Sequence, residues 1–107
     1  MQGKDDKENN MNYKATALYN ARREAMLDGF KAGDAVEAIG VTTVEAASFS
    51  KAASAVFEAY NIGGKQGHNR SMSVGDVISV ETEDGTIIFL TVAGAGFGML
   101  DEAPPVN

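Results

Sequence analysis

The sequence predicts an α+β fold in which a small, mostly antiparallel β-sheet of about four strands packs one face against one main helix. Apolar side chains recur between Phe49 and Tyr60 with the period of an amphipathic helix. Asp84-Gly85 lies between two apolar runs, a pattern typical of a β-hairpin. A β-branched run within residues 36–46 indicates a further strand. A single helix over one face of the sheet is the simplest arrangement that buries all of these surfaces.

The chain of 107 residues has the length of one domain. We expect a flexible polar tail at residues 1–10, a single α+β domain at residues 11–102 and a short tail at residues 103–107. The paired prolines at 104 and 105 cannot continue a strand ladder. The chain contains no cysteine, which excludes disulfides, thiolate zinc sites and cysteine nucleophiles.

The polar N-terminus lacks the apolar core of a signal peptide. No apolar run approaches the roughly 20 residues that a membrane helix needs. We therefore expect a soluble cytoplasmic protein that has no membrane partner.

The first strand is predicted at residues 13–19, where small or aromatic side chains alternate with Lys, Thr and Leu. Residues 21–27 fit two structures equally well. They could form a short helix capped by Asn20 and ended by Gly29, or an irregular loop.

The second strand is predicted at residues 36–46, with a bulge or kink where Gly40 interrupts the β-branched run. The main helix follows it. Ser48 or Ser50 can accept hydrogen bonds from the free N–H groups of its first turn, and Gly63 is expected to end it. Its apolar face consists of Phe49, Ala53, Val56, Phe57 and Tyr60.

The hairpin strands are predicted at residues 77–82 and 87–92. The second of them has no polar face, so we expect it to be central and covered on both sides. The residues expected to return to the core as a short last strand are Phe97, Met99 and Leu100.

The formal net charge is −6, from nine Lys+Arg and fifteen Asp+Glu. An acidic domain lacks the broad positive field that drives phosphate binding, so nucleic acid is a disfavoured partner. Anionic membrane surfaces are disfavoured for the same reason.

No motif in the chain predicts a catalytic, cofactor or metal site. Gly63-Gly64-Lys65 lacks the flanking residues of a phosphate-binding loop, and Gly94-x-Gly96-x-Gly98 has the wrong spacing for a dinucleotide motif. His68 has no neighbours at metal-ligand spacing, and we expect it to be an exposed loop residue. Ser71 and Ser73 lie near it in sequence, but their pattern is typical of a turn that enters a strand. We therefore expect no catalytic residue, no cofactor and no metal.

Surface charges are the best candidates for contact with a partner. Arg70 precedes the serine turn, and we expect it to pair with a carboxylate such as Asp76 rather than to bind a ligand. The acids at the hairpin predict a solvated rim, and the alternative is an acidic surface that imitates nucleic-acid phosphate. The candidate interaction residues are Arg22, Arg23, His68, Arg70, Glu81, Glu83 and Asp84.

The segment Arg70-Ser-Met-Ser-Val-Gly-Asp-Val-Ile78, followed by a hairpin and Gly96-Phe97, resembles the closing motif of the YodL-like proteins of phages and mobile elements. Residues 19–20 and 28–34, and the helix around residues 55–58, are also similar to such phage proteins. The resemblance covers about residues 13–101, with Met72 where the family usually has leucine. It implies a small phage-type protein that acts in the host cytoplasm, and it brings no established activity or catalytic residue.

We therefore expect a small phage-type accessory protein that is not an enzyme. Its expected role is that of a non-catalytic binding module acting on a host or defence protein, and the partner is a host or phage protein. An exposed strand edge could bind that partner, or could pair with a second copy to form a homodimer. The alternative is a nucleic-acid-related protein, either an acidic DNA mimic or a weak nucleic-acid binder.

Overall fold

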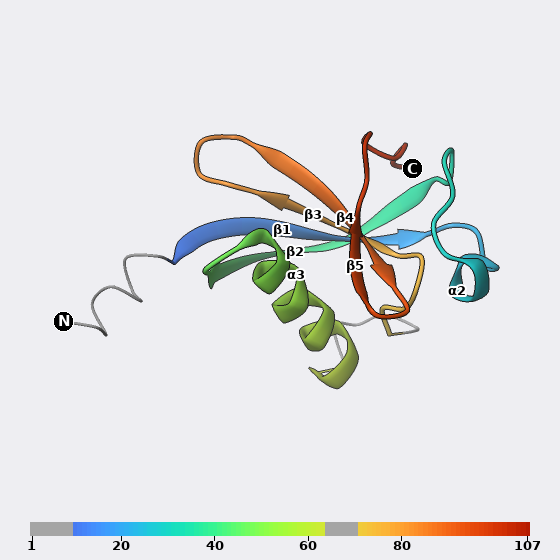
Figure 1. Ribbon diagram of the computed structural model, residues 1–107, viewed down its shortest axis with the longest axis horizontal. Helices are drawn as coiled ribbons and strands as arrows, with labels where there is room; N and C mark the ends of the chain where they lie inside the picture. Colours follow the sequence, from blue (N-terminus) through green and yellow to red (C-terminus); the bar gives the residue numbers. More distant parts are fainter. Residues whose placement is uncertain (1–9, 64–70) are drawn as a thin grey trace.

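The computed structural model describes residues 10–63 and 71–107, which form one antiparallel sheet with one main helix packed on it (Figure 1). The sheet has five strands in the order β2-β1-β3-β4-β5, and all neighbouring strands are antiparallel. The predicted α+β class is confirmed, and the expected number of about four strands is close. The strands are β1 (Met11–Asn20), β2 (Val36–Ala46), β3 (Val77–Glu81), β4 (Ile87–Ala93) and β5 (Gly96–Met99).

The main helix α3 (Phe49–Glu58) begins as the sequence predicts. The Ser48 hydroxyl accepts a hydrogen bond from the Lys51 backbone N–H at 3.2 Å, which caps the first turn. The α-helix ends before Gly63, because the backbone continues as the π-helical turn η1 (Ala59–Gly63). In this turn the Asn61 side chain donates to the Phe57 carbonyl at 2.9 Å.

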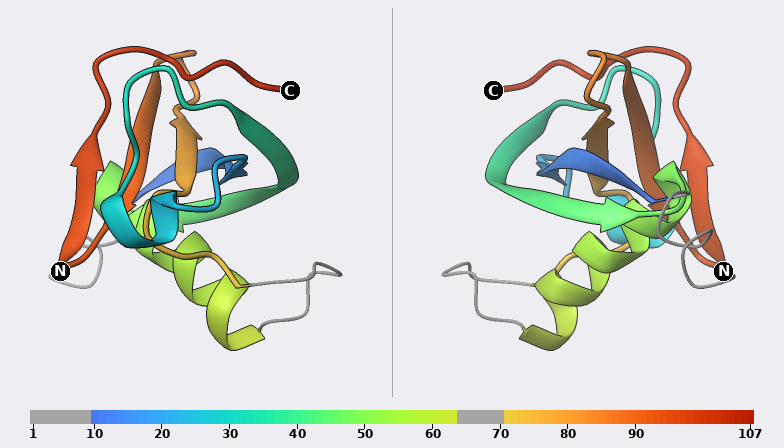
Figure 2. Two further views of the ribbon diagram at one scale, coloured as in Figure 1. Left: turned by 90° about the vertical axis from the view of Figure 1, so that its right-hand side faces the viewer. Right: turned by 90° about the vertical axis from the view of Figure 1, so that its left-hand side faces the viewer.

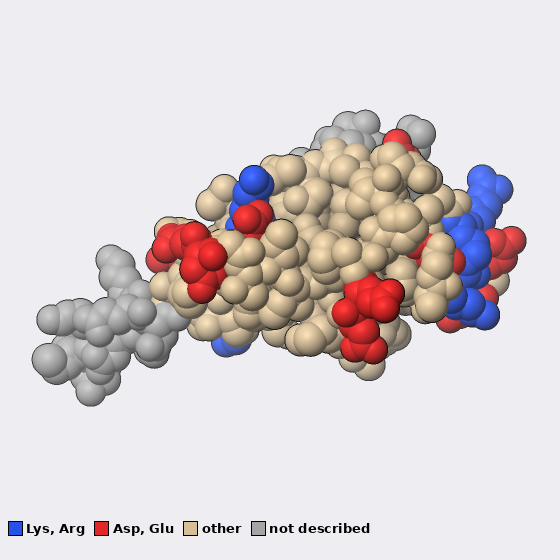
Figure 3. Space-filling view, turned by 90° about the horizontal axis from the view of Figure 1, so that it is seen from above, with Lys and Arg blue, Asp and Glu red and all other residues tan. Residues whose placement is uncertain are grey.

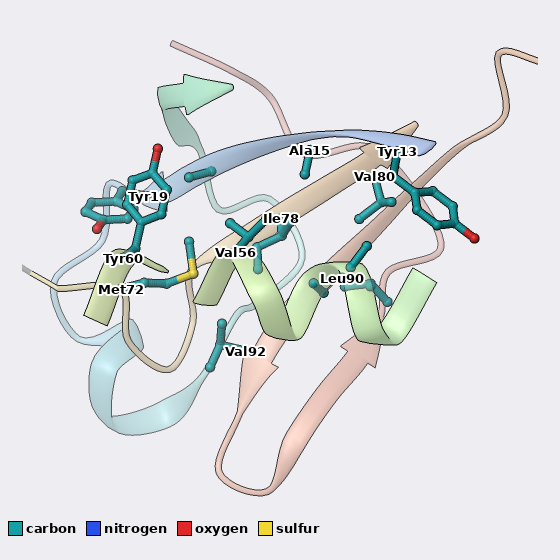
Figure 4. Close-up of a cluster of buried hydrophobic side chains, with 13 residues drawn as sticks. Tyr13, Ala15, Tyr19, Val56, Tyr60, Met72, Ile78, Val80, Leu90 and Val92 are labelled. Atoms are coloured by element: carbon teal, nitrogen blue, oxygen red, sulfur yellow. The ribbon is translucent and has the colours of Figure 1, made fainter. Parts of the chain in front are cut away.

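Helix α3 lies under the sheet (Figure 1), and three aromatic contacts fix α3 and the following η1 to it. Figure 4 shows the Tyr19 and Tyr60 rings at one end of this core and Tyr13 at the other. Phe49 meets Tyr13 near the start of β1, with ring centroids 5.3 Å apart. Tyr60 meets Tyr19 near the end of β1 at 6.4 Å, and Phe57 meets Phe97 of β5 at 6.2 Å. The larger buried side chains between these contacts are Val56, Met72, Ile78, Val80, Leu90 and Val92.

The opposite face of the sheet is only partly covered. Leu18, Val36 and Val77 form a second buried cluster, against which Phe30, Phe89 and Leu100 pack. This cluster lies over the end of β1 near Asn20 and does not reach the other end of the sheet. The prediction that the whole of residues 87–92 is covered on both sides is therefore wrong at Ile87, which is 49% exposed.

The predicted bulge in β2 is confirmed at Gly40. Ala17 pairs with Gly40 and Leu18 pairs with Ala38, so one extra residue of β2 lies between these pairs. A Cβ atom on Gly40 would meet the Tyr60 hydroxyl. Glycine therefore allows Tyr60 of the π-helical turn to lie directly against β2.

Both structures expected for residues 21–27 are partly right, because α2 (Ala25–Asp28) is a single short turn within a longer loop. Gly29 ends it with a positive φ of 84°. Capping by Asn20 is wrong, because the helix begins too far along the chain. The Asn20 side-chain oxygen accepts instead from the Arg22 backbone N–H at 2.7 Å.

The segment before β3 is a strand-entry turn, as its serines and glycine predict. The Asp76 N–H donates to the Ser73 carbonyl at 3.1 Å, and Gly75 has a φ of 92°. A Cβ atom on Gly75 would lie 2.5 Å from the Ala25 side chain and 2.6 Å from the Ala25 carbonyl oxygen. Gly75 is therefore required both for the backbone conformation and for the contact with α2.

We expect Gly75→Ala to lower the free energy of unfolding by about 3 kcal/mol, because left-handed strain and the clash with Ala25 add together. The matched control is Gly85→Ala at the hairpin turn. Gly85 has a similar φ of 95° and no heavy atom within 4 Å of an added Cβ, so only the strain of about 1 kcal/mol applies. Urea denaturation followed by circular dichroism measures both. Equal losses in the two variants would contradict the close contact with α2.

Candidate functional site

The candidate residue Arg22 lies at one end of the sheet and holds together the loop between β1 and β2. Its guanidinium donates to both carboxylate oxygens of Asp34, at 2.8 Å and 3.0 Å. It also donates to Asp28 at 3.0 Å and to the Gly29 carbonyl at 2.8 Å. The guanidinium thereby joins residues from both ends of the loop, which makes it part of the fold rather than a free cationic site.

Asn20 extends this network into the interior. Its backbone N–H donates to Asp76 at 2.8 Å, and its side chain donates to Asp34 at 3.1 Å and to the Gly75 carbonyl at 3.0 Å. Asp76 also accepts from the Ser73 N–H at 2.9 Å. Within residues 10–63 and 71–107, no buried side-chain nitrogen or oxygen lacks a hydrogen-bond partner. The network is thus satisfied by the chain itself.

The pKa values of Arg22, Asp28 and Asp34 are each shifted toward the ionised form. Hydrogen bonds from Arg22 hold the pKa of Asp34 well below its ordinary value, against the opposing effect of burial. Asp34 in turn raises the pKa of Arg22. At Asp28 desolvation raises the pKa, but the hydrogen bond from Arg22 and the charges of Arg22 and Lys31 together outweigh it.

The acidic candidates lie at the other end of the sheet, around the hairpin. Glu83 accepts a hydrogen bond from the Asn12 side chain at 3.0 Å. Asp84 accepts from the Thr82 hydroxyl and the Thr86 N–H, and these bonds lower its pKa. A shallow groove of about 260 Å³ lies beside these residues and is lined by Asn12, Tyr13, Lys14, Thr43, Glu81, Thr82 and Glu83.

Of the predicted interaction residues that the structure describes, the arginines and the acids lie at opposite ends of the sheet. Arg22 and the exposed Arg23 follow the last residue of β1, whereas Glu81 pairs with Lys14 near its start. His68 and Arg70 lie outside the described residues, and so does the predicted pairing of Arg70 with Asp76. On the face seen in Figure 3, the acidic side chains form separate patches and the basic ones lie close to acidic ones.

The largest unused bonding surface of the described chain is the outer edge of β2. Figure 2 shows β2 and β5 at opposite margins of the sheet, and β2 is the longer, with 11 residues against four. Among residues 10–63 and 71–107, the backbone bonds on the outer side of β2 involve its first residue alone. Val36 donates to the Pro105 carbonyl at 2.9 Å and accepts from the Asn107 N–H at 2.8 Å.

The direction of the remaining backbone groups follows from the strand register. Asn20 directs its N–H toward Asp76 beside β3, and Ala21 donates to the Ala35 carbonyl on the β2 side. Because alternate residues of a strand bond to opposite sides, the odd-numbered residues of β1 bond to β2. Their partners beyond the bulge are Gly40, Thr42, Val44 and Ala46.

Val41, Thr43 and Glu45 alternate with the residues of β2 that bond to β1. Their N–H and C=O groups therefore point outward, away from β1. All three are exposed, Val41 to 60%. Within the described ranges these outward groups have no recorded backbone partner. The β-branched run in the sequence predicts this strand. Its position at the edge of the sheet follows from the strand order, which the sequence pattern does not indicate.

The chain matches no family model, no curated protein and no solved structure. The resemblance to YodL-like proteins stays a prediction. No helix in the described part of the chain has both the length and the apolar character needed to cross a membrane. Residues 10–63 and 71–107 also contain no group of three or more His, Asp or Glu side chains placed to hold a metal ion.

The Arg22–Asp34 contact predicts a specific pH dependence of stability. Because the pKa of Asp34 is lowered by folding, its stabilising effect is complete above the unfolded pKa of about 3.9 and is lost as the pH falls through the folded value. Asp34→Asn should lower the free energy of unfolding at pH 7 by about 2 kcal/mol. The wild-type and variant values should converge as the pH falls below about 4.

Urea denaturation at a series of pH values measures this convergence. Asp101→Asn is the matched control, because Asp101 is exposed and forms no ion pair with any residue of the described ranges. A constant difference between wild type and Asp34→Asn down to pH 3 would show that the charge of Asp34 is not what stabilises the loop.

Proposed function

We propose that the protein is a non-catalytic binding module that takes an extended segment of a partner protein as an additional strand on the outer edge of β2. The observation that carries this proposal is the row of exposed, outward-pointing backbone groups at Val41, Thr43 and Glu45. Strand addition uses such groups for affinity and the alternating side chains for specificity.

The chain's own C-terminal residues support this mode of binding. Val106 forms a parallel bridge with Val36, and the flanking backbone bonds occupy the outward groups of Val36. The first residue of β2 therefore already accepts an extended segment on its outer side. A partner strand would use the same kind of bonds further along, between Val41 and Glu45.

The inner side of β2 supports the proposal as well. β1 pairs with β2 along all ten of its residues and with β3 on its other side, and the rings of Tyr13 and Tyr19 pack against α3 and η1. Because β1 is held in this way and pairs with the whole of β2, the outward backbone groups of β2 are aligned before a partner binds. Preorganisation of this kind lowers the entropic cost of binding.

The charge arrangement favours a protein over nucleic acid as the partner. A nucleic-acid binder needs a basic stripe, whereas the described arginines Arg22 and Arg23 lie at one end and Arg22 is bonded to two carboxylates. A DNA mimic needs a continuous acidic surface, whereas the acids in Figure 3 lie in separate patches. That the partner is a host or phage protein is inferred only from the resemblance.

The test is selection of short peptides from a random library on the immobilised protein, followed by amide chemical-shift mapping. Selected peptides should perturb the amides of residues 41–45. Thr43→Pro should weaken the binding of these peptides by about tenfold or more, because proline removes an outward N–H and blocks the approaching strand. Since that N–H takes no part in the β1–β2 ladder, the variant should remain folded.

Two controls accompany this variant. Thr43→Val keeps the backbone and the β-branched shape, so it should retain binding. Thr42→Pro removes an N–H that faces β1, so it should lower stability rather than act on binding alone. Peptides that bind Thr43→Pro as tightly as wild type, or that map to another surface, would refute strand addition at β2.

A further inference from the structure

The outer edge of β2 carries acidic side chains near both of its ends and no basic side chain. Its 11 residues include Glu37 and Glu45 and no lysine, arginine or histidine. Both glutamates are exposed, and neither forms an ion pair with a residue of the described ranges. The free carboxylates therefore lie beside the backbone groups that would receive an added strand.

The bulge at Gly40 places these two carboxylates on opposite faces of the sheet. Glu37 pairs with Tyr19, whose ring packs with that of Tyr60 on the side of α3. Glu45 pairs with Asn12, whose side chain lies on the other face because it precedes Tyr13 in an alternating strand. A segment bound along β2 would therefore lie beside one glutamate near each end, and these two glutamates are on opposite faces of the sheet.

We propose, on the basis of the strand addition proposed above, that the segment bound at β2 is a basic one, with a lysine or arginine opposite Glu45. Directly opposed side chains on neighbouring strands lie about 5 Å apart, so a charge of opposite sign there stabilises the pair and one of the same sign destabilises it. The formal net charge of −6 adds a long-range attraction for a basic partner.

The same charges argue against a second copy as the occupant. Two β2 edges would bring four glutamates together without any basic residue of either strand to offset them. Each chain also carries a formal net charge of −6, so the approach of two copies is opposed by repulsion. The β-branched residues Val41 and Thr43 supply the uncharged contact between the acidic ends, and similar side chains in the partner suit them.

The test compares two synthetic peptides of about seven residues, the length of an ordinary strand. Both have alternating valine and threonine and blocked termini, and one carries lysine at both ends where the other carries glutamate. Titration of the isotope-labelled full chain should shift the amides of residues 41–45. The lysine peptide should bind about tenfold more tightly, and about 0.5 M salt should reduce this preference.

Glu45→Lys should abolish or reverse the preference between the two peptides. Glu102→Lys is the matched control, since it makes the same change in net charge at an exposed position outside the sheet. In that variant the preference for the lysine peptide should persist.

The outcomes separate the two proposals. Equal binding of both peptides at residues 41–45 overturns the basic partner and leaves strand addition standing. Binding of neither peptide at these residues overturns both. A concentration-dependent dimer in sedimentation that Thr43→Pro dissociates would identify a second copy as the occupant and would overturn the basic partner.

Discussion

The network that joins Asn20, Arg22, Asp34 and Asp76 is the constraint on which the rest of the structure depends. It lies where the end of β1 meets the loop before β2 and the turn before β3. Asn20 and Asp76 are 8% and 1% exposed, and a buried polar group without a partner is costly. The loop and the turn must therefore both reach their native positions for either to be stable, which fixes the strands on both sides of β1.

Once these ends are fixed, the two faces of the sheet are covered unequally. Helix α3 and its aromatic contacts cover one face from β1 to β5. The second cluster, around Leu18 and Val77, covers only the part of the other face near the network. The described residues leave the rest of that face and the outer edge of β2 beyond Val36 uncovered. The polar and β-branched composition of β2 suits that exposure.

The elements that depend on neighbouring residues could be predicted from the sequence, such as the Ser48 cap, the bulge at Gly40 and the hairpin turn. The pairings between distant residues could not. Arg22 could be recognised as a cation, but nothing in the sequence indicates that Asp34 and Asp28 neutralise it. Likewise, the β-branched run predicts a strand at residues 36–46, but its place at the edge depends on β1 pairing with β3, some 60 residues further along. The candidate binding edge is thus a property of strand order, which local patterns do not encode.

The bonds between Val36 and residues 105 and 107 have a consequence for the time course of folding. β1 and β2 are close in sequence and can pair while the chain is still being synthesised. The outer groups of Val36 gain their partners only after residue 107 has been made. Contacts between such distant segments slow folding, because the chain loses the entropy of closing a long loop before these contacts stabilise it. During that interval the edge of β2 is open from its first residue, so a segment of another chain can compete with the protein's own C-terminal residues for Val36.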